Sequence, residues 1–226
     1  MVAKLSAAEF MTVVRIPWHA LLLVVAGLLS GCAGVGLVED RDYLRIDPPQ
    51  AVASGNQIEV IEFFWYGCPH CADMHPRLKA WRQRQPSDVG LRYQPVATRE
   101  RWEGGARVHY ALEALGRAGQ LADALFEATQ LDGLDLNDEA ALFDWAERQG
   151  LNRQEFIDAC RSPTVQRQVE EARAIGERYQ VNGVPTLVVD GKYLTSNALT
   201  GSADDTLAVV DRLVQKARDE RAPARR

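Results

Sequence analysis

The stretch V-I-E-F-F-W-Y-G-C-P-H-C spans residues 60–71 and joins two different patterns. Residues 58–66 are almost continuously apolar and aromatic, which is typical of a strand buried on both faces of a sheet. Directly after them, Pro69 suits the first turn of a helix. The stretch therefore predicts a central strand that leads straight into a helix, with Cys68 and Cys71 at the junction.

Further strand patterns lie on both sides of this junction. An alternating run at residues 43–46 predicts an edge strand, and residues 91–96 predict a second buried strand. Residues 186–195 predict a hairpin, and a last helix follows it. Between them, apolar residues recur at helical spacing from residue 99 to residue 180. The order of these elements predicts an α/β protein with a block of helices inserted into its sheet-forming part.

The composition excludes several classes of protein. The chain has 226 residues, of which 46% are hydrophobic and 25% are charged. These values are typical of a globular protein, and they exclude disorder or a multi-span membrane protein as the main architecture. With 31 acidic and 26 basic side chains the net charge is -5, which gives no support for a nucleic-acid partner.

The first 31 residues are typical of an export signal. Basic residues precede an uncharged apolar stretch at residues 20–29, which is shorter than the roughly 20 residues that a membrane span needs. The sequence L-S-G-C that follows resembles the lipobox of bacterial lipoproteins, which implies that Cys32 becomes a lipidated N-terminus. The alternative is an uncleaved anchor over residues 16–38, and both interpretations hold the domain outside the cytoplasm.

Cys68 and Cys71 form a C-x-x-C motif, for which three kinds of chemistry are open. A structural disulfide that closes so small a loop would stabilise the fold little. A metal site needs about four ligands, whereas His75 is the one further ligand nearby and Cys160 stands apart. A redox-active dithiol is therefore the interpretation that we favour.

The position of Cys68 favours a low thiol pKa. The first N–H groups of a helix have no partner within the helix, so the sulfur of Cys68 feels the positive end of the helix dipole. His70 adds a donor or a positive charge nearby. Each unit by which folding lowers the pKa stabilises the reduced form by about 1.4 kcal/mol, or about 30 mV for a two-electron couple. Such a pair suits a donor of disulfides.

The stretch at residues 60–71 is followed about 110 residues later by V-N-G-V-P-T at residues 181–186. This combination resembles the DsbA family of thioredoxin-fold thiol oxidases, and the likeness covers about residues 41–215. It implies an α/β, thioredoxin-like fold with a helical insertion domain. We expect a lipoprotein signal peptide at 1–31, a tether and edge strand at 32–56, the two parts of the thioredoxin-like domain at 57–98 and 181–217, the helical insert at 99–180, and a tail at 218–226.

The resemblance also implies a function and partners. It implies a periplasmic thiol:disulfide oxidoreductase that passes its disulfide to reduced exported proteins and is recharged by a DsbB-like, quinone-linked membrane oxidase. The lipid on Cys32 would anchor it to a bacterial membrane, and no cofactor or nucleic acid is expected. A disulfide isomerase or reductase is one alternative. A membrane-tethered zinc or copper carrier that uses Cys68, Cys71 and His75 is another.

Within the motif, the resemblance implies a role for each residue. A substrate thiolate attacks the sulfur of Cys68, Cys71 leaves as the buried partner, and a second substrate thiol resolves the mixed disulfide. The intervening dipeptide, Pro69 and His70, is the variant typical of the family. All four residues are therefore assigned to the catalytic site.

Two residues of the second motif are assigned to substrate binding. Pro185 matches the cis-proline of the family, which faces the disulfide. The resemblance implies that the backbone of Val184 is then exposed to pair with an extended substrate segment. The alternative is a trans proline that simply opens a strand.

Glu62 is the least obvious candidate. It lies six residues before Cys68, so strand alternation puts it on the same face as Phe64 and Tyr66, where burial would raise the pKa of its carboxyl. It could move the proton of Cys71. Family members often pair this acid with a lysine, for which this sequence offers Arg92 or Arg99. The alternative is a partly solvated or ion-paired acid.

The other thiol and two histidines are expected outside the reaction. Cys160 lies four residues after Phe156 and so on the same helical face, which favours a packed and inert thiol. His109 is expected at the surface or behind the site, and His75 on a helix surface.

Overall fold

The computed structural model describes residues 36–222. The export signal and the lipidated Cys32 that the sequence predicts lie outside this part of the chain. No helix among the described residues is both long and apolar enough to cross a membrane.

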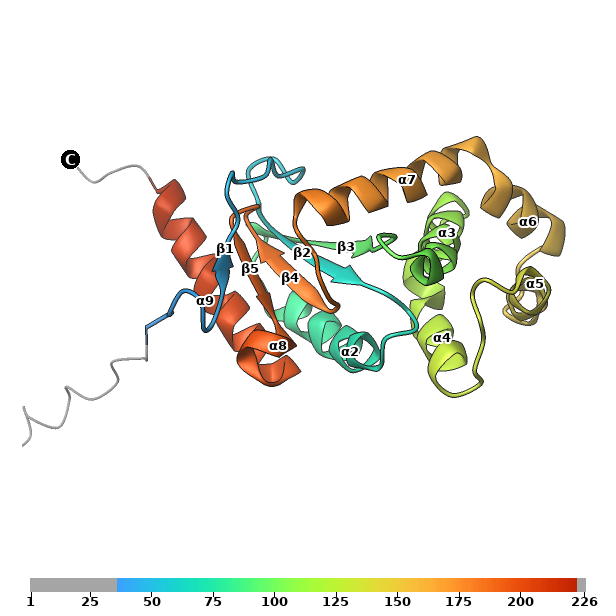
Figure 1. Ribbon diagram of the computed structural model, residues 1–226, viewed down its shortest axis with the longest axis horizontal. Helices are drawn as coiled ribbons and strands as arrows, with labels where there is room; N and C mark the ends of the chain where they lie inside the picture. Colours follow the sequence, from blue (N-terminus) through green and yellow to red (C-terminus); the bar gives the residue numbers. More distant parts are fainter. Residues whose placement is uncertain (1–35, 223–226) are drawn as a thin grey trace, which may run out of the picture. The chain divides into compact units, whose positions relative to one another are not determined.

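The centre of the described part is a mixed sheet with the strand order β1-β5-β4-β2-β3 (Figure 1). All seven residues of β2 are buried, and this strand pairs in parallel with β3 and antiparallel with β4. The prediction of a central strand with two buried faces is therefore confirmed. The strands are β1 Leu44–Arg45, β2 Ile58–Phe64, β3 Val89–Pro95, β4 Thr186–Val189 and β5 Tyr193–Ser196.

Two helices, α2 Pro69–Arg84 and α9 Ala203–Arg221, pack against one face of this sheet. Side chains from both helices form one apolar core with the side chains of Ile58 and Val60 on β2. The short helix α8 Asn197–Thr200 follows β5. Because α2 begins five residues after the last residue of β2, the strand delivers the cysteine motif to the carboxyl end of the sheet.

The end of α9 differs from the sequence expectation of a tail from residue 218. The helix continues to Arg221 because the guanidinium groups of its last turn have partners. Arg218 forms an ion pair with Asp88, and Arg221 forms one with the buried carboxylate of Asp190. These contacts fasten the last turn to the ends of the strands.

Five helices lie between β3 and β4; four of them gather beside the sheet, and the last, α7, runs back to cover the face of the sheet opposite to α2 and α9 (Figure 1). Asn152 and Ser162 cap two of them, each accepting a hydrogen bond from a backbone N–H three residues later. The core of these helices also contains Phe64, Tyr66 and both cysteines of the C-x-x-C motif. The helices are α3 Glu100–Ala114, α4 Ala118–Gln130, α5 Glu139–Arg148, α6 Arg153–Arg161 and α7 Pro163–Arg178.

Candidate active site

Cys68 is the N-cap residue of α2, and its side chain meets the second sequence motif. Its thiol donates a hydrogen bond of 3.4 Å to the backbone oxygen of Val184. The peptide bond between Val184 and Pro185 is cis. The fold thus brings together two motifs that are more than a hundred residues apart in the sequence, as expected.

The surroundings of Cys68 stabilise its thiolate. The pKa of Cys68 falls to about 6, chiefly because the Cys71 thiol donates a hydrogen bond to it. Partial burial opposes this change, while the backbone N–H groups of Cys71 and His70 and the charge of the exposed His70 add to it. The direction of this change, and the contributions of the backbone N–H groups and His70, are as the position at a helix N-terminus predicted, but the largest cause, the Cys71 thiol, was not part of that prediction.

Cys71 lies one turn further into α2 and has the opposite character. Its side chain is completely buried, and both cysteines are free thiols. Burial raises the pKa of Cys71 well above its ordinary value, and the hydrogen bond to Cys68 and the nearby carboxylate of Glu62 raise it further. One cysteine of the pair is thus a thiolate at neutral pH and the other a thiol.

Glu62 lies beneath this pair and is almost completely buried, with 1% of its surface exposed. Burial raises the pKa of its carboxyl to about 8, and the charge of Cys68 adds to this effect. Its Oε1 atom has no hydrogen-bond partner among the described residues. The alternative of a solvated or ion-paired acid is therefore wrong, and Glu62 is protonated at neutral pH.

Neither of the two arginines expected beside Glu62 lies next to it. The parallel register pairs Glu62 with Tyr93, so Arg92 points to the other face of the sheet. There, Nε of Arg92 lies 3.5 Å from Oε1 of Glu59. Arg99 instead donates a hydrogen bond to the backbone oxygen of Asn182. The expectation that Arg92 or Arg99 pairs with Glu62 is therefore wrong.

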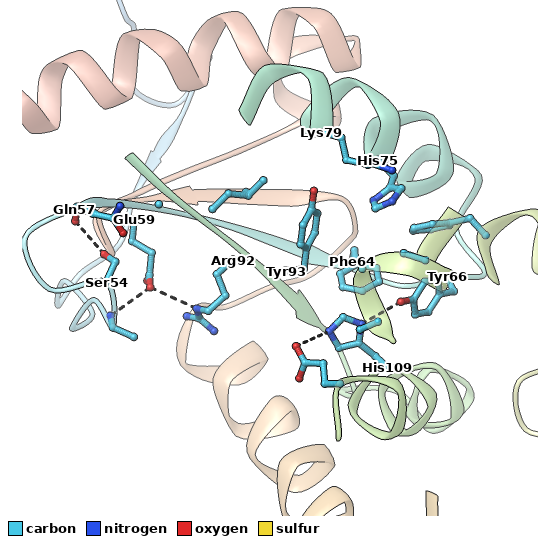
Figure 2. Close-up of a pocket in the computed structure, with 18 residues that line it drawn as sticks. Ser54, Gln57, Glu59, Phe64, Tyr66, His75, Lys79, Arg92, Tyr93 and His109 are labelled. Carbon is cyan, nitrogen blue, oxygen red and sulfur yellow. Dashed lines mark hydrogen bonds and ion pairs between the residues drawn. The ribbon is translucent and has the colours of Figure 1, made fainter. Parts of the chain in front are cut away.

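Tyr66, which precedes Gly67 and Cys68, is hydrogen-bonded to the inserted helices. The backbone oxygen of Tyr66 accepts hydrogen bonds from Thr129 Oγ1 at 2.9 Å and from Gln130 Nε2 at 2.8 Å. The Tyr66 hydroxyl lies 3.0 Å from Nδ1 of His109, and Nε2 of His109 lies 3.4 Å from Oε1 of Glu113 (Figure 2). The polar groups of Tyr66 are thus paired with α3 and α4.

Sequence reasoning missed this arrangement. Thr129 and Gln130 lie at the end of a helix, and nothing in their spacing relates them to Tyr66. His109 is buried behind the site, which is one of the two places expected for it. His75 is also buried, and its Nε2 lies 3.0 Å from Oδ1 of Asp123, so the expectation of a surface position is wrong. One signal was available, since His75 follows the buried Cys71 by one helical turn.

Two cavities lie near the junction. One, of about 610 Å³, lies among β3, α2, α3 and α4, and His75, Tyr93 and His109 line it without either cysteine (Figure 2). The other, of about 830 Å³, is lined by His70, Val184 and Pro185 together with α8. The second cavity therefore borders the cysteine motif on the side of the cis-proline.

The structure also shows where Cys160 lies and whether the described residues could bind a metal ion. Cys160 is buried beside Phe156, and burial raises its pKa to about 12, as expected of a packed thiol. Within residues 36–222, no three His, Cys, Asp or Glu side chains are grouped so that they could hold a metal ion.

Comparison with known proteins identifies close relatives. The family model for the DSBA-like thioredoxin domain matches residues 59–209. The thiol:disulfide interchange protein DsbA of Burkholderia cepacia is 35% identical over 204 residues, which cover 88% of this chain and 96% of that protein. Its counterpart from Pseudomonas syringae pv. tomato is 33% identical over 198 residues, covering 87% and 92% of the two chains.

Solved structures agree with these sequence matches. The crystal structure of Pseudomonas aeruginosa DsbA superposes with a TM-score of 0.77 at 30% identity and covers 81% of this chain and 96% of that one. The oxidoreductase DsbA from Xylella fastidiosa gives a TM-score of 0.75 at 31% identity, with 81% and 98% covered.

Proposed function

The chain belongs to the DsbA-like thioredoxin-domain family, and from this premise we propose how it works as a thiol:disulfide oxidoreductase. It donates a disulfide held by Cys68 and Cys71 to reduced exported proteins. One observation carries the assignment of roles within the pair: the pKa of Cys68 is lowered to about 6, whereas the pKa of Cys71, three residues away, is raised.

In the first step, a substrate thiolate attacks the sulfur of Cys68 in the oxidised protein. The bond between the two active-site sulfurs breaks, and its electron pair leaves on Cys71. A second thiolate of the substrate then attacks the substrate sulfur of the mixed disulfide, and Cys68 leaves as a thiolate. Two electrons pass from the substrate to the cysteine pair, and the substrate gains one disulfide.

The low pKa of Cys68 supports this direction of electron flow. A thiol with a low pKa is a good leaving group, so it is released readily from the mixed disulfide. The folded protein also stabilises the thiolate, which is present only in the reduced form. The reduced state is therefore favoured, and the disulfide is a strong oxidant.

Glu62 is proposed to supply the proton that Cys71 needs. When Cys71 leaves, it is a buried thiolate whose pKa burial raises, so it must gain a proton. The buried carboxyl of Glu62, whose pKa is about 8, is protonated at neutral pH and lies close enough to affect the Cys71 thiol. The proton passes from Glu62 to the Cys71 sulfur, and Glu62 later regains one from solvent.

Val184 and Pro185 are proposed to position the substrate. The backbone oxygen of Val184 lies 3.4 Å from the Cys68 sulfur, so a backbone that pairs with Val184 brings its own cysteine within reach. Pro69 and His70 begin α2, and the charge of His70 helps to lower the pKa of Cys68. The cavity lined by His70, Val184 and Pro185 gives room for substrate side chains.

The place of action and the recharging partner are further parts of the proposal. The export signal and L-S-G-C in the sequence support a periplasmic protein held to a bacterial membrane by lipid on Cys32. A DsbB-like, quinone-linked membrane oxidase would then regenerate the disulfide. Labelling with radioactive palmitate tests the anchor: we expect label in the wild-type protein and none in the Cys32→Ser variant, and equal labelling would contradict it.

The test of the catalytic roles is a trapping experiment. We expect the Cys71→Ser variant to accumulate mixed disulfides with client proteins through Cys68, because no second active-site thiol is present to release them. The wild-type protein in its oxidised form should transfer one disulfide to a reduced, unfolded client. A Cys71→Ser protein without covalent adducts would contradict the roles assigned to the pair.

A further inference from the structure

Two tryptophans and two arginines lie together beside the cysteine motif, and we call Trp65, Arg99, Arg101 and Trp102 the Trp–Arg surface. The arginines are exposed and Trp65 is partly exposed, while Trp102 is buried behind them. The two indole rings are stacked, with centroids 5.8 Å apart and planes at 28°. The Arg99 guanidinium lies 4.6 Å from the ring centroid of Trp102, and that of Arg101 lies 5.3 Å from the ring centroid of Trp65. These distances are those of cation–π contacts, which hold both guanidinium groups against the rings.

The ring of Trp65 is seated by two glycines. A Cβ atom at Gly67 would lie 2.3 Å from Cζ2 of Trp65, and one at Gly105 would lie 3.1 Å from its Cδ1. A larger residue at Gly67 would displace the ring, and one at Gly105 would crowd it. Gly105 lies inside α3, where glycine costs about 1 kcal/mol relative to alanine. The close approach of Trp65 to the helix gives that glycine a structural reason.

The backbone beneath the arginines is fixed as well. The side chain of Asn137 donates to the backbone oxygen of Arg101 at 3.2 Å and accepts from the backbone N–H of Gly104 at 3.2 Å. Arg99 donates to the backbone oxygen of Asn182 at 3.3 Å, two residues before Val184. The Trp–Arg surface is thus attached to the segment that receives the substrate.

The two guanidinium groups keep hydrogen-bonding capacity. Both side chains are exposed, and in residues 36–222 neither forms an ion pair with a carboxylate; the carboxylate of Glu103 nearby pairs with Arg173 instead. A guanidinium that lies over an aromatic face still presents N–H groups at its edge, and this fork matches a carboxylate. The surface therefore has the chemistry of a carboxylate-binding site.

We propose that the Trp–Arg surface binds acidic residues that flank the reacting cysteine of a client protein. The inference rests on the proposed function, because the client cysteine must come to the sulfur of Cys68 and its neighbours then pass along Val184 and Asn182. Arg99 is bonded to this same segment, and Trp65 lies three residues before Cys68. Clients with Asp or Glu close to a cysteine are therefore preferred over clients with Lys at the same positions.

The test uses three reduced two-cysteine peptides that differ only in the residues flanking one cysteine, which are Glu, Gln or Lys. The oxidised wild-type protein should oxidise the Glu peptide with a kcat/KM about three- to tenfold above that of the Lys peptide at low salt. The preference should disappear at high salt, where charges are screened.

The variant that tests the assignment combines Arg99→Gln and Arg101→Gln. It should oxidise the Glu and Lys peptides with equal kcat/KM, and this ratio is the readout, because loss of the hydrogen bond from Arg99 to Asn182 acts on the rates with all three peptides alike. The control is Arg167→Gln, which replaces an exposed arginine of α7 and should keep the wild-type preference. A wild-type protein without preference, or a double variant that keeps it, would overturn the inference. If the oxidised wild-type protein fails to oxidise the Gln peptide, the proposed function is overturned, and the inference with it.

Discussion

Cys68 and Cys160 are both buried thiols, with 9% and 3% of their surfaces exposed, yet their chemistry is opposite. Cys68 begins α2, where the Cys71 thiol and backbone N–H groups donate to its sulfur and lower its pKa to about 6. Cys160 lies in the last turn of α6, where burial dominates and raises its pKa to about 12. Burial alone therefore makes a thiol inert. A reactive thiol needs donors around its sulfur, and the start of a helix supplies them.

The largest effect that this comparison predicts is on turnover. Cys68→Ser should lower the rate of client oxidation by at least about 1,000-fold, because the attacked sulfur is lost. Cys160→Ser should leave the rate within about twofold, because its thiol takes no part in the reaction. The measurement is oxidation of a reduced, unfolded client by each variant. A Cys160→Ser variant with a large loss of activity would contradict the claim that this thiol is inert.

The fold followed from local patterns in the sequence, and so did the position of the reactive thiol. The apolar run before Cys68 predicted a central strand, and Pro69 predicted the helix start, because both depend on neighbouring residues alone. The surroundings of Glu62 depend on strand register instead. A shift of one residue in the register exchanges Tyr93 for Arg92, and the sequence does not determine that shift.

The second prediction concerns the stability of the oxidised protein, in which no active-site thiol titrates. Burial is the larger cause of the raised pKa of Glu62 and acts in the oxidised protein as well, although the charge of Cys68 does not, so the unfolded chain loses this proton at lower pH than the folded protein does. Stability must therefore fall as pH rises above about 4.5, by up to about 1.4 kcal/mol per pH unit from this group. Glu62→Gln should remove a loss of about 2 kcal/mol between pH 5 and pH 8.

The measurement is urea unfolding of both oxidised proteins at pH 5 and at pH 8. A matched control is Glu127→Gln, which changes an exposed carboxylate on α4 and should keep the difference in stability that the wild type shows between the two pH values. If Glu62→Gln and wild type lose the same stability between the two pH values, then Glu62 is ionised in the folded protein and cannot supply a proton to Cys71.

The smallest effect concerns the residue that holds the loop before Cys68. Tyr66→Phe removes the contact between the hydroxyl and Nδ1 of His109 and should lower the free energy of unfolding by about 1–2 kcal/mol. It should also raise the pKa of Cys68, because the sulfur is then less firmly held against its donors. A double-mutant cycle with His109→Gln measures the pair, and we expect a coupling of about 1 kcal/mol. A coupling near zero would contradict a stabilising contact between Tyr66 and His109.

The contacts of Tyr66 also show which part of the site could not be predicted from the sequence. Its hydroxyl and carbonyl find partners on two inserted helices, and those partners are 43 to 64 residues away in the sequence. Each is an ordinary helix residue by composition and spacing. Such contacts arise when the helices pack, so the three-dimensional structure was needed to find them.

The most direct test of the whole account is the pKa of Cys68 in the reduced protein. Thiolate absorbance near 240 nm, followed against pH in the Cys160→Ser variant, should rise with a midpoint near pH 6. In the same protein, the thiolate should add to the stability of the reduced form as pH rises from about 6 to about 9, and this contribution should be absent below pH 6. A midpoint near 9, the value of an ordinary thiol, would contradict the account.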